Sequence, residues 1–139
     1  MFKFGKNSEK KLEKVHFLLQ KVLKRAIIST RVDFSIVSGY RDKEMQDSLF
    51  RSGHSKLRWP NSKHNSDPSL AVDIAVYRNG KLDWQDLNSY YYLAGLIQAI
   101  ADSMNITLRF GLDWDRDGDF NDQTFLDAGH IELVNEDTE

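Results

Sequence analysis

The clearest element in the sequence is residues 70–81, Leu70-Ala-Val-Asp-Ile-Ala-Val-Tyr-Arg-Asn-Gly-Lys81. Its largely apolar first part predicts a β-strand. The pair Asn79-Gly80 follows and is typical of a tight turn between paired strands. Asp73 interrupts the apolar run, and a carboxylate in such a place is costly unless it is paired or binds a metal. We therefore expect a strand that carries one functional charge.

The segments on either side predict further helices and strands. Apolar residues at spacings of three and four predict long helices at 9–28 and 84–104, with Ser8 and Asp83 as their N-caps. We also expect a short helix at 42–51 that ends at Gly53, strands at 33–39, 106–110 and 130–134, and loops at 54–69 and 113–122. Because consecutive strands can pair through turns, we predict an α+β fold. Residues 1–139 are expected to form a single compact domain with a mostly antiparallel sheet and helices packed on it.

The composition excludes several functional classes. The chain has 139 residues, 40% hydrophobic and 29% charged, with 8 Gly and 2 Pro, which excludes disordered and collagen-like chains. A net charge of -2 gives no general attraction to nucleic acid or to an anionic membrane. Without cysteine, any metal must be held by histidine and carboxylates. Since no apolar run approaches ~18 residues and no apolar signal core is seen, we expect the protein to stay in the cytoplasm unless another protein releases it. Nothing suggests an obligate oligomer, so we also expect a monomer.

A candidate metal site involves residues far apart in the chain. His64 precedes the strand that carries Asp73, and His130 begins the last strand, where it and Glu132 face the same side. Two histidines and one aspartate are a workable ligand set for catalytic zinc. Asp127, three residues before His130, is placed to act as a general base. Such a set also arises by chance, so spacing alone leaves the site open.

Other candidate residues have ordinary interpretations from the sequence alone. His16 and His54 are interpreted as a helix-edge residue and a polar-loop residue. Arg41 follows a predicted strand, where it either pairs with a surface acid or clamps a substrate carboxylate or a developing oxyanion. Trp59, in the loop before His64, is the aromatic residue that we expect to line a groove.

The acidic segment Asp113-Trp-Asp-Arg-Asp-Gly-Asp-Phe-Asn-Asp122 is similar to a calcium loop. It has carboxylates at positions 1, 3 and 5 and glycine at position 6, an arrangement that suits a hard cation. Position 12 is Thr124 instead of glutamate, so Asp122 would have to close a shorter loop. The alternative is a solvated acidic turn, but crowded carboxylates repel one another without a cation. We predict a regulatory or structural calcium site formed by Asp113, Asp115, Asp117, Asp119 and Asp122.

Four motifs in a fixed order resemble the zinc peptidases of the D-alanyl-D-alanine carboxypeptidase and L-alanyl-D-glutamate endopeptidase family. These motifs are Gly39-Tyr-Arg41, Ser62-x-His64, Ala71-Val-Asp73 and Asp127-x-x-His130. Residues 2–10 and 108–114 are more similar still to the single-domain endolysins of tailed coliphages. The similarity extends from Phe2 to about Val134.

The resemblance implies a Hedgehog/D-Ala-D-Ala peptidase-like fold with one zinc ion. It implies zinc binding by His64, Asp73 and His130. It also implies that Asp127 is the catalytic acid/base, that Arg41 stabilises the tetrahedral intermediate and that Ser62 contacts substrate.

The segment between His64 and Asp73 departs from the family pattern Ser-x-His-x-x-Gly-x-Ala-x-Asp. It is two residues longer and lacks the glycine. Because the extra residues fall in a loop with Pro68, the strand can keep its register. The ligand assignment therefore stands, while the loop shape and the fit of substrate are expected to differ.

The function implied is that of a phage endolysin, a zinc peptidase that hydrolyses the L-alanyl-D-glutamate bond of peptidoglycan stem peptides. We expect it to wait in the host cytoplasm until a separate pore-forming protein releases it to the periplasm. Its expected partner is peptidoglycan, with no nucleic acid and no stable membrane association. Two alternatives stay open: a D-alanyl-D-alanine carboxypeptidase or dipeptidase, and a non-catalytic zinc-containing binding module, against which Asp127 argues.

Overall fold

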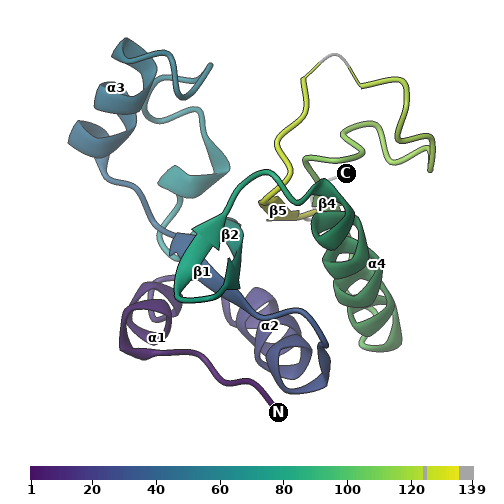
Figure 1. Cartoon of the computed structure of the whole chain (residues 1–139). Coiled ribbons are helices and arrows are strands. Elements are labelled where there is room, and N and C mark those ends of the chain that lie inside the picture. Colours follow the sequence, from purple (N-terminus) through teal and green to yellow (C-terminus); the bar gives the residue numbers. More distant parts are fainter. Residues whose placement is uncertain (124, 135–139) are drawn as a thin grey trace.

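The computed structural model describes residues 1–123 and 125–134, and in them five strands form one sheet. The strands are β1 (Phe34–Ser38), β2 (Ala71–Arg78), β3 (Lys81–Asp83), β4 (Leu108–Phe110) and β5 (His130–Leu133). Their order is β1-β2-β5-β4, β3 pairs with β2, and these pairings are antiparallel. The predicted α+β fold with a mostly antiparallel sheet is confirmed (Figure 1).

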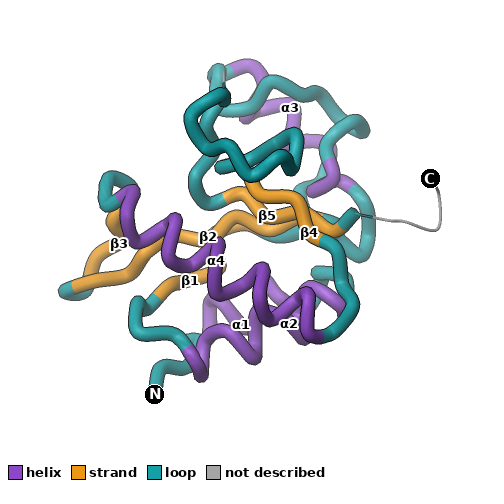
Figure 2. The backbone as a smooth tube through the Cα atoms, turned by 90° about the vertical axis from the view of Figure 1, so that its right-hand side faces the viewer, coloured by secondary structure: helices purple, strands orange, loops and turns teal. Residues whose placement is uncertain are grey.

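The helices divide between the two sides of the sheet. On one side lie α1 (Lys6–Leu12), α2 (Phe17–Ser29) and α4 (Leu87–Ser103), and α2 contacts α4 (Figure 2). Their buried apolar residues form one core with those of the strands. On the other side lie α3 (Lys43–Arg51), the 3-10 helix η1 (Lys63–Asn65) and the long loops. Among the described residues, no helix is both long and apolar enough to cross a membrane.

Strand β2 is central because it pairs with β1, β3 and β5. Ile74 and Val76 are buried in the core, and the alternation leaves Asp73 on the opposite face. Asn79 and Gly80 have φ values of 56° and 76°, the left-handed conformation that a two-residue hairpin turn needs, so the predicted turn is confirmed. Asp73 is thereby fixed between β1 and β5.

The prediction of one continuous helix at residues 9–28 is wrong, because the helix is interrupted between α1 and α2. At the break, His16 N–H donates to Ser69 O and Ser69 N–H donates to Lys14 O, at 2.9 and 2.7 Å. His16 also caps α2 by accepting Leu18 N–H. Tertiary hydrogen bonds to a distant loop therefore replace the helical bonds that the apolar spacing favoured.

The same break packs tightly on Gly39, just after β1. A Cβ at Gly39 would lie 2.9 Å from both Lys11 O and Val15 Cγ2. Glycine permits this approach because it has no side chain. The backbone of Gly39 is thus held against the N-terminal segment.

Two predicted helix caps are also wrong. Ser8 lies inside α1, buried, and its hydroxyl accepts Ile36 N–H at 3.0 Å. Asp83 accepts the N–H groups of Gln85 and Asp86, so it caps a turn before α4. The N-cap of α4 is Asp86, and the helix therefore starts at Leu87 rather than at 84.

Candidate functional site

Three side chains with metal-ligand chemistry meet where β2 and β5 pair. The register sets Asp73 opposite His130, and η1 brings His64 to the same place. One ligand atom of each residue lies within 4.8 Å of the other two. His64 Nε2 lies 3.3 Å from Asp73 Oδ2, and His130 Nδ1 lies 3.3 Å from Asp73 Oδ1. The structure therefore brings the three predicted metal ligands together, and we refer to them as the inner cluster.

The donor chemistry of the inner cluster fits a metal ion. His64 Nδ1 lies 2.7 Å from the carbonyl oxygen of Gly39, which can only accept, so Nδ1 carries the proton. The buried Nε2 of His64 is left as a bare acceptor with no hydrogen-bond partner within residues 1–123 and 125–134. Buried polar atoms are normally satisfied, and a metal ion held with Asp73 and His130 would satisfy this one.

The charges of the inner cluster are strongly coupled. Although burial acts to raise it, the hydrogen bond with His130 and the nearby His64 ring hold the pKa of Asp73 well below its usual range. Burial acts to lower the pKa of His130, but hydrogen bonds with Asp73 and Glu132 outweigh it and raise that pKa to about 9. Asp73 is therefore an ionised carboxylate, the form that binds a cation.

Arg41 is fixed beside the inner cluster. Its Nη2 lies 2.7 Å from Asp73 Oδ2, while its Nε donates to Ser38 and its Nη1 donates to Gln46. Gln46 is fully buried and also accepts a hydrogen bond from Asn65 of η1. The acid that pairs with Arg41 is thus the predicted ligand itself and not a surface carboxylate. Sequence reasoning missed Gln46, because no local pattern marks a polar residue whose partners lie in other elements.

Asp127 lies at the same site and is held by the backbone of Gly111. Asp127 N–H donates to Gly111 O at 3.1 Å, and Gly111 N–H donates to His130 O at 2.9 Å. A Cβ at Gly111 would overlap the carbonyl oxygen of Asp127. Burial and the neighbouring Asp73 carboxylate raise the pKa of Asp127. A raised pKa makes the carboxylate a stronger base, which suits a group that takes up and returns a proton.

A groove of about 500 Å³ opens over the inner cluster. Its lining includes Arg41, Asp127 and two inner-cluster histidines, His64 and His130. Ser62, predicted to contact substrate, also lines it and caps η1. The groove therefore brings together the predicted acid/base, the predicted oxyanion residue and the metal-ligand set.

The aromatic wall of the groove differs from the prediction. Trp114 and Phe125 stack with ring centroids 6.1 Å apart, and the Trp114 ring lies 5.0 Å from that of His130. Lys56 Nζ lies 4.1 Å from the centre of the Phe125 ring. In the described part of the chain, the residues that line the groove do not include Trp59. The sequence signal for Trp114 was its position, directly after the first acidic residue of the predicted calcium loop.

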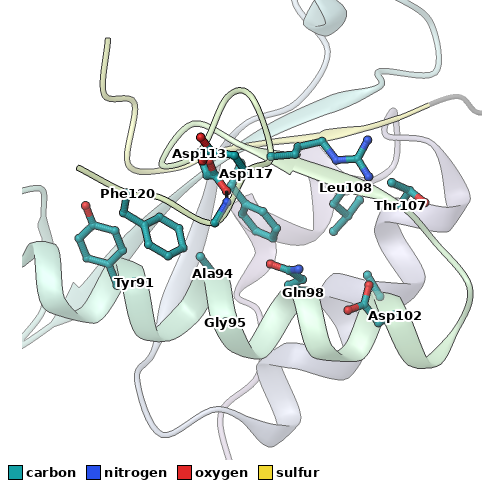
Figure 3. A pocket seen from close by; sticks show the side chains of 14 residues that line it. Tyr91, Ala94, Gly95, Gln98, Asp102, Thr107, Leu108, Asp113, Asp117 and Phe120 are labelled. Carbon is teal, nitrogen blue, oxygen red and sulfur yellow. Dashed lines mark hydrogen bonds between the residues drawn. The ribbon is translucent and has the colours of Figure 1, made fainter. Parts of the chain in front are cut away.

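The loop between β4 and β5 gathers carboxylates at a second place. Ligand oxygens of Asp113, Asp115 and Asp117 lie within 4.8 Å of one another, and we refer to these residues as the outer cluster. Asp113 Oδ1 is buried and, among the described residues, has no hydrogen-bond partner. Figure 3 shows Asp113 and Asp117 close together above α4, in a pocket where Phe120 packs against Tyr91.

The other two predicted calcium ligands, Asp119 and Asp122, are not members of the outer cluster, although Asp122 contacts Asp117. Asp119 Oδ1 accepts the N–H of Asn121. A hydrogen bond with Asp117, burial and repulsion from Asp115 raise the pKa of Asp122 to about 6. Asp115 and Asp122 also line the groove, so the acidic loop forms part of its wall. Thr124 lies outside the described residues.

Comparison with known proteins identifies similar chains across almost the whole length. A family model described as phage L-alanyl-D-glutamate peptidase matches residues 1–134. The chain is 42% identical over 137 residues to the L-alanyl-D-glutamate peptidase of Escherichia phage T5, covering 96% of this chain and 98% of that protein. The crystal structure of the Serratia marcescens L-Ala D-Glu endopeptidase ChiX matches with a TM-score of 0.79 and 26% identity, over 98% of this chain and 93% of that one.

Proposed function

The chain belongs to the phage L-alanyl-D-glutamate peptidase family, and on this premise we propose that it is an endolysin that cleaves peptidoglycan stem peptides between L-alanine and D-glutamate. One observation carries the proposal: a metal-ligand set, an acid/base and a guanidinium meet in one groove. A peptidase of this type needs all three. Cleavage of the stem peptides weakens the wall and lyses the host cell.

We assign zinc to the inner cluster. Two imidazoles and one carboxylate are a ligand set of catalytic zinc, and they leave a position open for the reaction. The bare Nε2 of His64 and the ionised Asp73 support this assignment. Zinc bound there would supply Lewis-acid chemistry, because it makes water more acidic and polarises a carbonyl oxygen.

In the proposed reaction, Asp127 and Arg41 have separate roles. Asp127 takes a proton from the attacking water and delivers it to the amine of D-glutamate as the amide bond breaks. The guanidinium of Arg41 stabilises the negative charge that develops on the carbonyl oxygen. Ser38 and Gln46 hold that guanidinium in place, so it need not be ordered during the reaction. Ser62 and the Trp114 wall contact the stem peptide.

We further propose that the outer cluster binds calcium and that this ion regulates the enzyme. Its support is the meeting of three carboxylates around a buried, unsatisfied Asp113 oxygen. The next residue, Trp114, packs on His130, so ordering of the acidic loop would reach the groove directly. Calcium would then act by holding the groove wall in one conformation.

The decisive experiment is mass spectrometry of purified Gram-negative peptidoglycan after digestion, with and without a zinc chelator. We expect new amino termini on D-glutamate that disappear with the chelator and return with added zinc. The His64→Ala variant is the matched control and should give no product. Loss of terminal D-alanine alone would indicate a carboxypeptidase, and the absence of any product would favour a binding module.

The place of action is a separate proposal. We propose that the enzyme accumulates in the host cytoplasm and reaches the wall after another protein opens the inner membrane. Expression with and without a pore-forming protein tests this, since lysis is expected only when both are present.

A further inference from the structure

Glu132 is a buried carboxylate to which the proposed reaction gives no role. It is 6% exposed and lies on β5 two residues after His130, so both side chains point to the same face of the sheet. Its Oε1 lies 2.8 Å from His130 Nε2, whereas Nδ1 of that ring faces Asp73. A neutral imidazole carries one N–H, and a carboxylate can only accept. Both ring nitrogens thus face a carboxylate, and the contact of Nε2 is the shorter, at 2.8 against 3.3 Å. When a metal ion displaces the proton on Nδ1, the ring keeps a single N–H, which the contact with Glu132 holds on Nε2.

The second oxygen of Glu132 is paired with two cations. Glu132 Oε2 lies 3.1 Å from Arg109 Nη1 and 3.5 Å from Lys63 Nζ. Arg109 is the cross-strand neighbour of Glu132 on β4. Because these two cations balance the buried charge, Glu132 stays ionised and remains an acceptor for the N–H of His130.

The same carboxylate also joins the two elements that carry the histidines. Lys63 lies in η1 directly before His64, and its Nζ donates to Leu133 O at 3.3 Å as well as reaching Glu132. Glu132 itself lies on β5 with His130. Replacement of Glu132 would therefore remove one of the two contacts by which Lys63 of η1 is bound to β5.

We propose that Glu132 is a positioning residue of the metal centre, which holds the Nε2 proton of His130 and so presents Nδ1 to the metal. In His64 the two ring nitrogens are exchanged: Nδ1 donates to the Gly39 carbonyl, and Nε2 faces the metal site. This inference rests on the proposed zinc site and adds to it a side chain that does not touch the metal. Loss of such an outer partner typically weakens metal binding by about 10- to 100-fold.

Zinc affinity, measured by competition with a chromophoric chelator, gives the first test. Glu132→Met removes the acceptor and should weaken zinc binding by about 10- to 100-fold. Glu132→Gln keeps an oxygen that can accept from Nε2 and should recover most of the affinity. Glu9→Gln, on the exposed face of α1, is the matched control and should equal wild type. A folded Glu132→Met protein with wild-type affinity would overturn the proposal.

Cobalt substitution separates positioning from a purely structural role. The visible spectrum of bound Co²⁺ reports ligand geometry and should change in Glu132→Met. If Glu132 only stabilised the fold, the melting temperature of the metal-free protein would fall while the cobalt spectrum stayed that of wild type.

A third test needs no variant and so does not depend on folding. Long-range ¹⁵N–¹H spectra of the zinc-loaded wild type should show His64 bound through Nε2 and His130 bound through Nδ1 with a protected Nε2–H. Binding of His130 through Nε2 would exclude the contact with Glu132 and end the proposal. The zinc site itself is checked with His130→Ala: if this variant binds zinc as wild type does, the proposed site fails together with the role of Glu132.

Discussion

The inner and outer clusters each gather three potential ligands within 4.8 Å, yet different structures hold them. The inner cluster lies on paired strands and a capped 3-10 helix. In each of its histidines, the ring nitrogen that faces away from Asp73 is hydrogen-bonded, to Gly39 O in His64 and to Glu132 in His130. The outer cluster lies in a loop, where Asp115 and Asp117 are exposed and carboxylates face one another. The first cluster is thus organised before any ion binds, whereas the carboxylates of the second repel one another, and the calcium proposed there would relieve this repulsion.

The pKa shifts express the same difference. The two neighbouring histidines, acting against burial, lower the pKa of Asp73, while the contact with Asp117 raises the pKa of Asp122 to about 6. A carboxylate that is stable as an anion suits a resident catalytic metal. A carboxyl group that holds a proton near pH 6 suits an exchangeable ion that responds to conditions.

The largest expected loss of activity comes from two variants of the groove, one that removes the proposed base and one that removes a proposed metal ligand. Asp127→Asn should retain zinc and lower kcat by about 10²- to 10⁴-fold, because it removes the base but no ligand. His130→Ala should lose both zinc and activity. Metal content by mass spectrometry and initial rates on peptidoglycan measure the two effects. An Asp127→Asn enzyme within tenfold of wild type would remove this residue from the mechanism.

A smaller effect is expected at Gly111, which contacts the backbone of Asp127 and lies two residues before Asp113 of the outer cluster. Gly111→Ala would push a methyl group into the backbone of Asp127, so we expect a loss of more than tenfold in activity and a lower melting temperature. Gly95→Ala on α4 is the matched control, because nothing lies within 4 Å of its Cβ position. Its activity should be unchanged and its stability equal to or up to about 1 kcal/mol above wild type. Equal activity of the two variants would show that the position of Asp127 is not critical.

The smallest effect concerns the outer cluster and pH. Because the pKa of Asp122 is raised to about 6, the folded protein holds a proton that the unfolded chain releases nearer pH 4. The associated stability is therefore present at low pH and is lost as pH rises through about 6. Because Asp122 shares this proton with Asp117 of the outer cluster, calcium binding at Asp117 would compete with it.

Calcium should accordingly raise the melting temperature by a few degrees at pH 7.5 and by less at pH 5. The Asp115→Asn/Asp117→Asn double variant is the control, and its melting temperature should not respond to calcium. Scanning calorimetry with calcium or with a calcium-selective chelator measures both. An equal response at the two pH values, or a response in the double variant, would contradict the assignment.

Local patterns in the sequence predicted much of this fold. The apolar run of β2 and the Asn79-Gly80 turn identified the strand and its hairpin, and the two-residue period placed His130 and Glu132 on one face. These features are set by neighbours along the chain. The helix break at 13–16 could not be predicted in this way, because it depends on hydrogen bonds with Ser69.

The supporting residues of the site were likewise beyond local patterns. The role of Glu132 depends on Arg109 and Lys63, and these come from β4 and η1. Trp59 was expected in the groove because of its place before His64, but it is not among the described residues that line the groove, and Trp114 lies beside His130. The metal ligands could be predicted from their residue types, whereas the residues that hold the ligands in place could be identified only from the three-dimensional structure.

The tight packing of Gly39 has a consequence for protein engineering. Its carbonyl accepts the His64 proton, and its backbone presses on Lys11 and Val15. Shortening or redesigning the N-terminal helices to obtain a smaller or more heat-resistant lytic protein would shift that carbonyl and tilt the imidazole. We expect a protein altered in this way to hold the proposed zinc ion less tightly, although every residue of the groove was left untouched. Metal retention, rather than expression yield, is therefore the property to screen first.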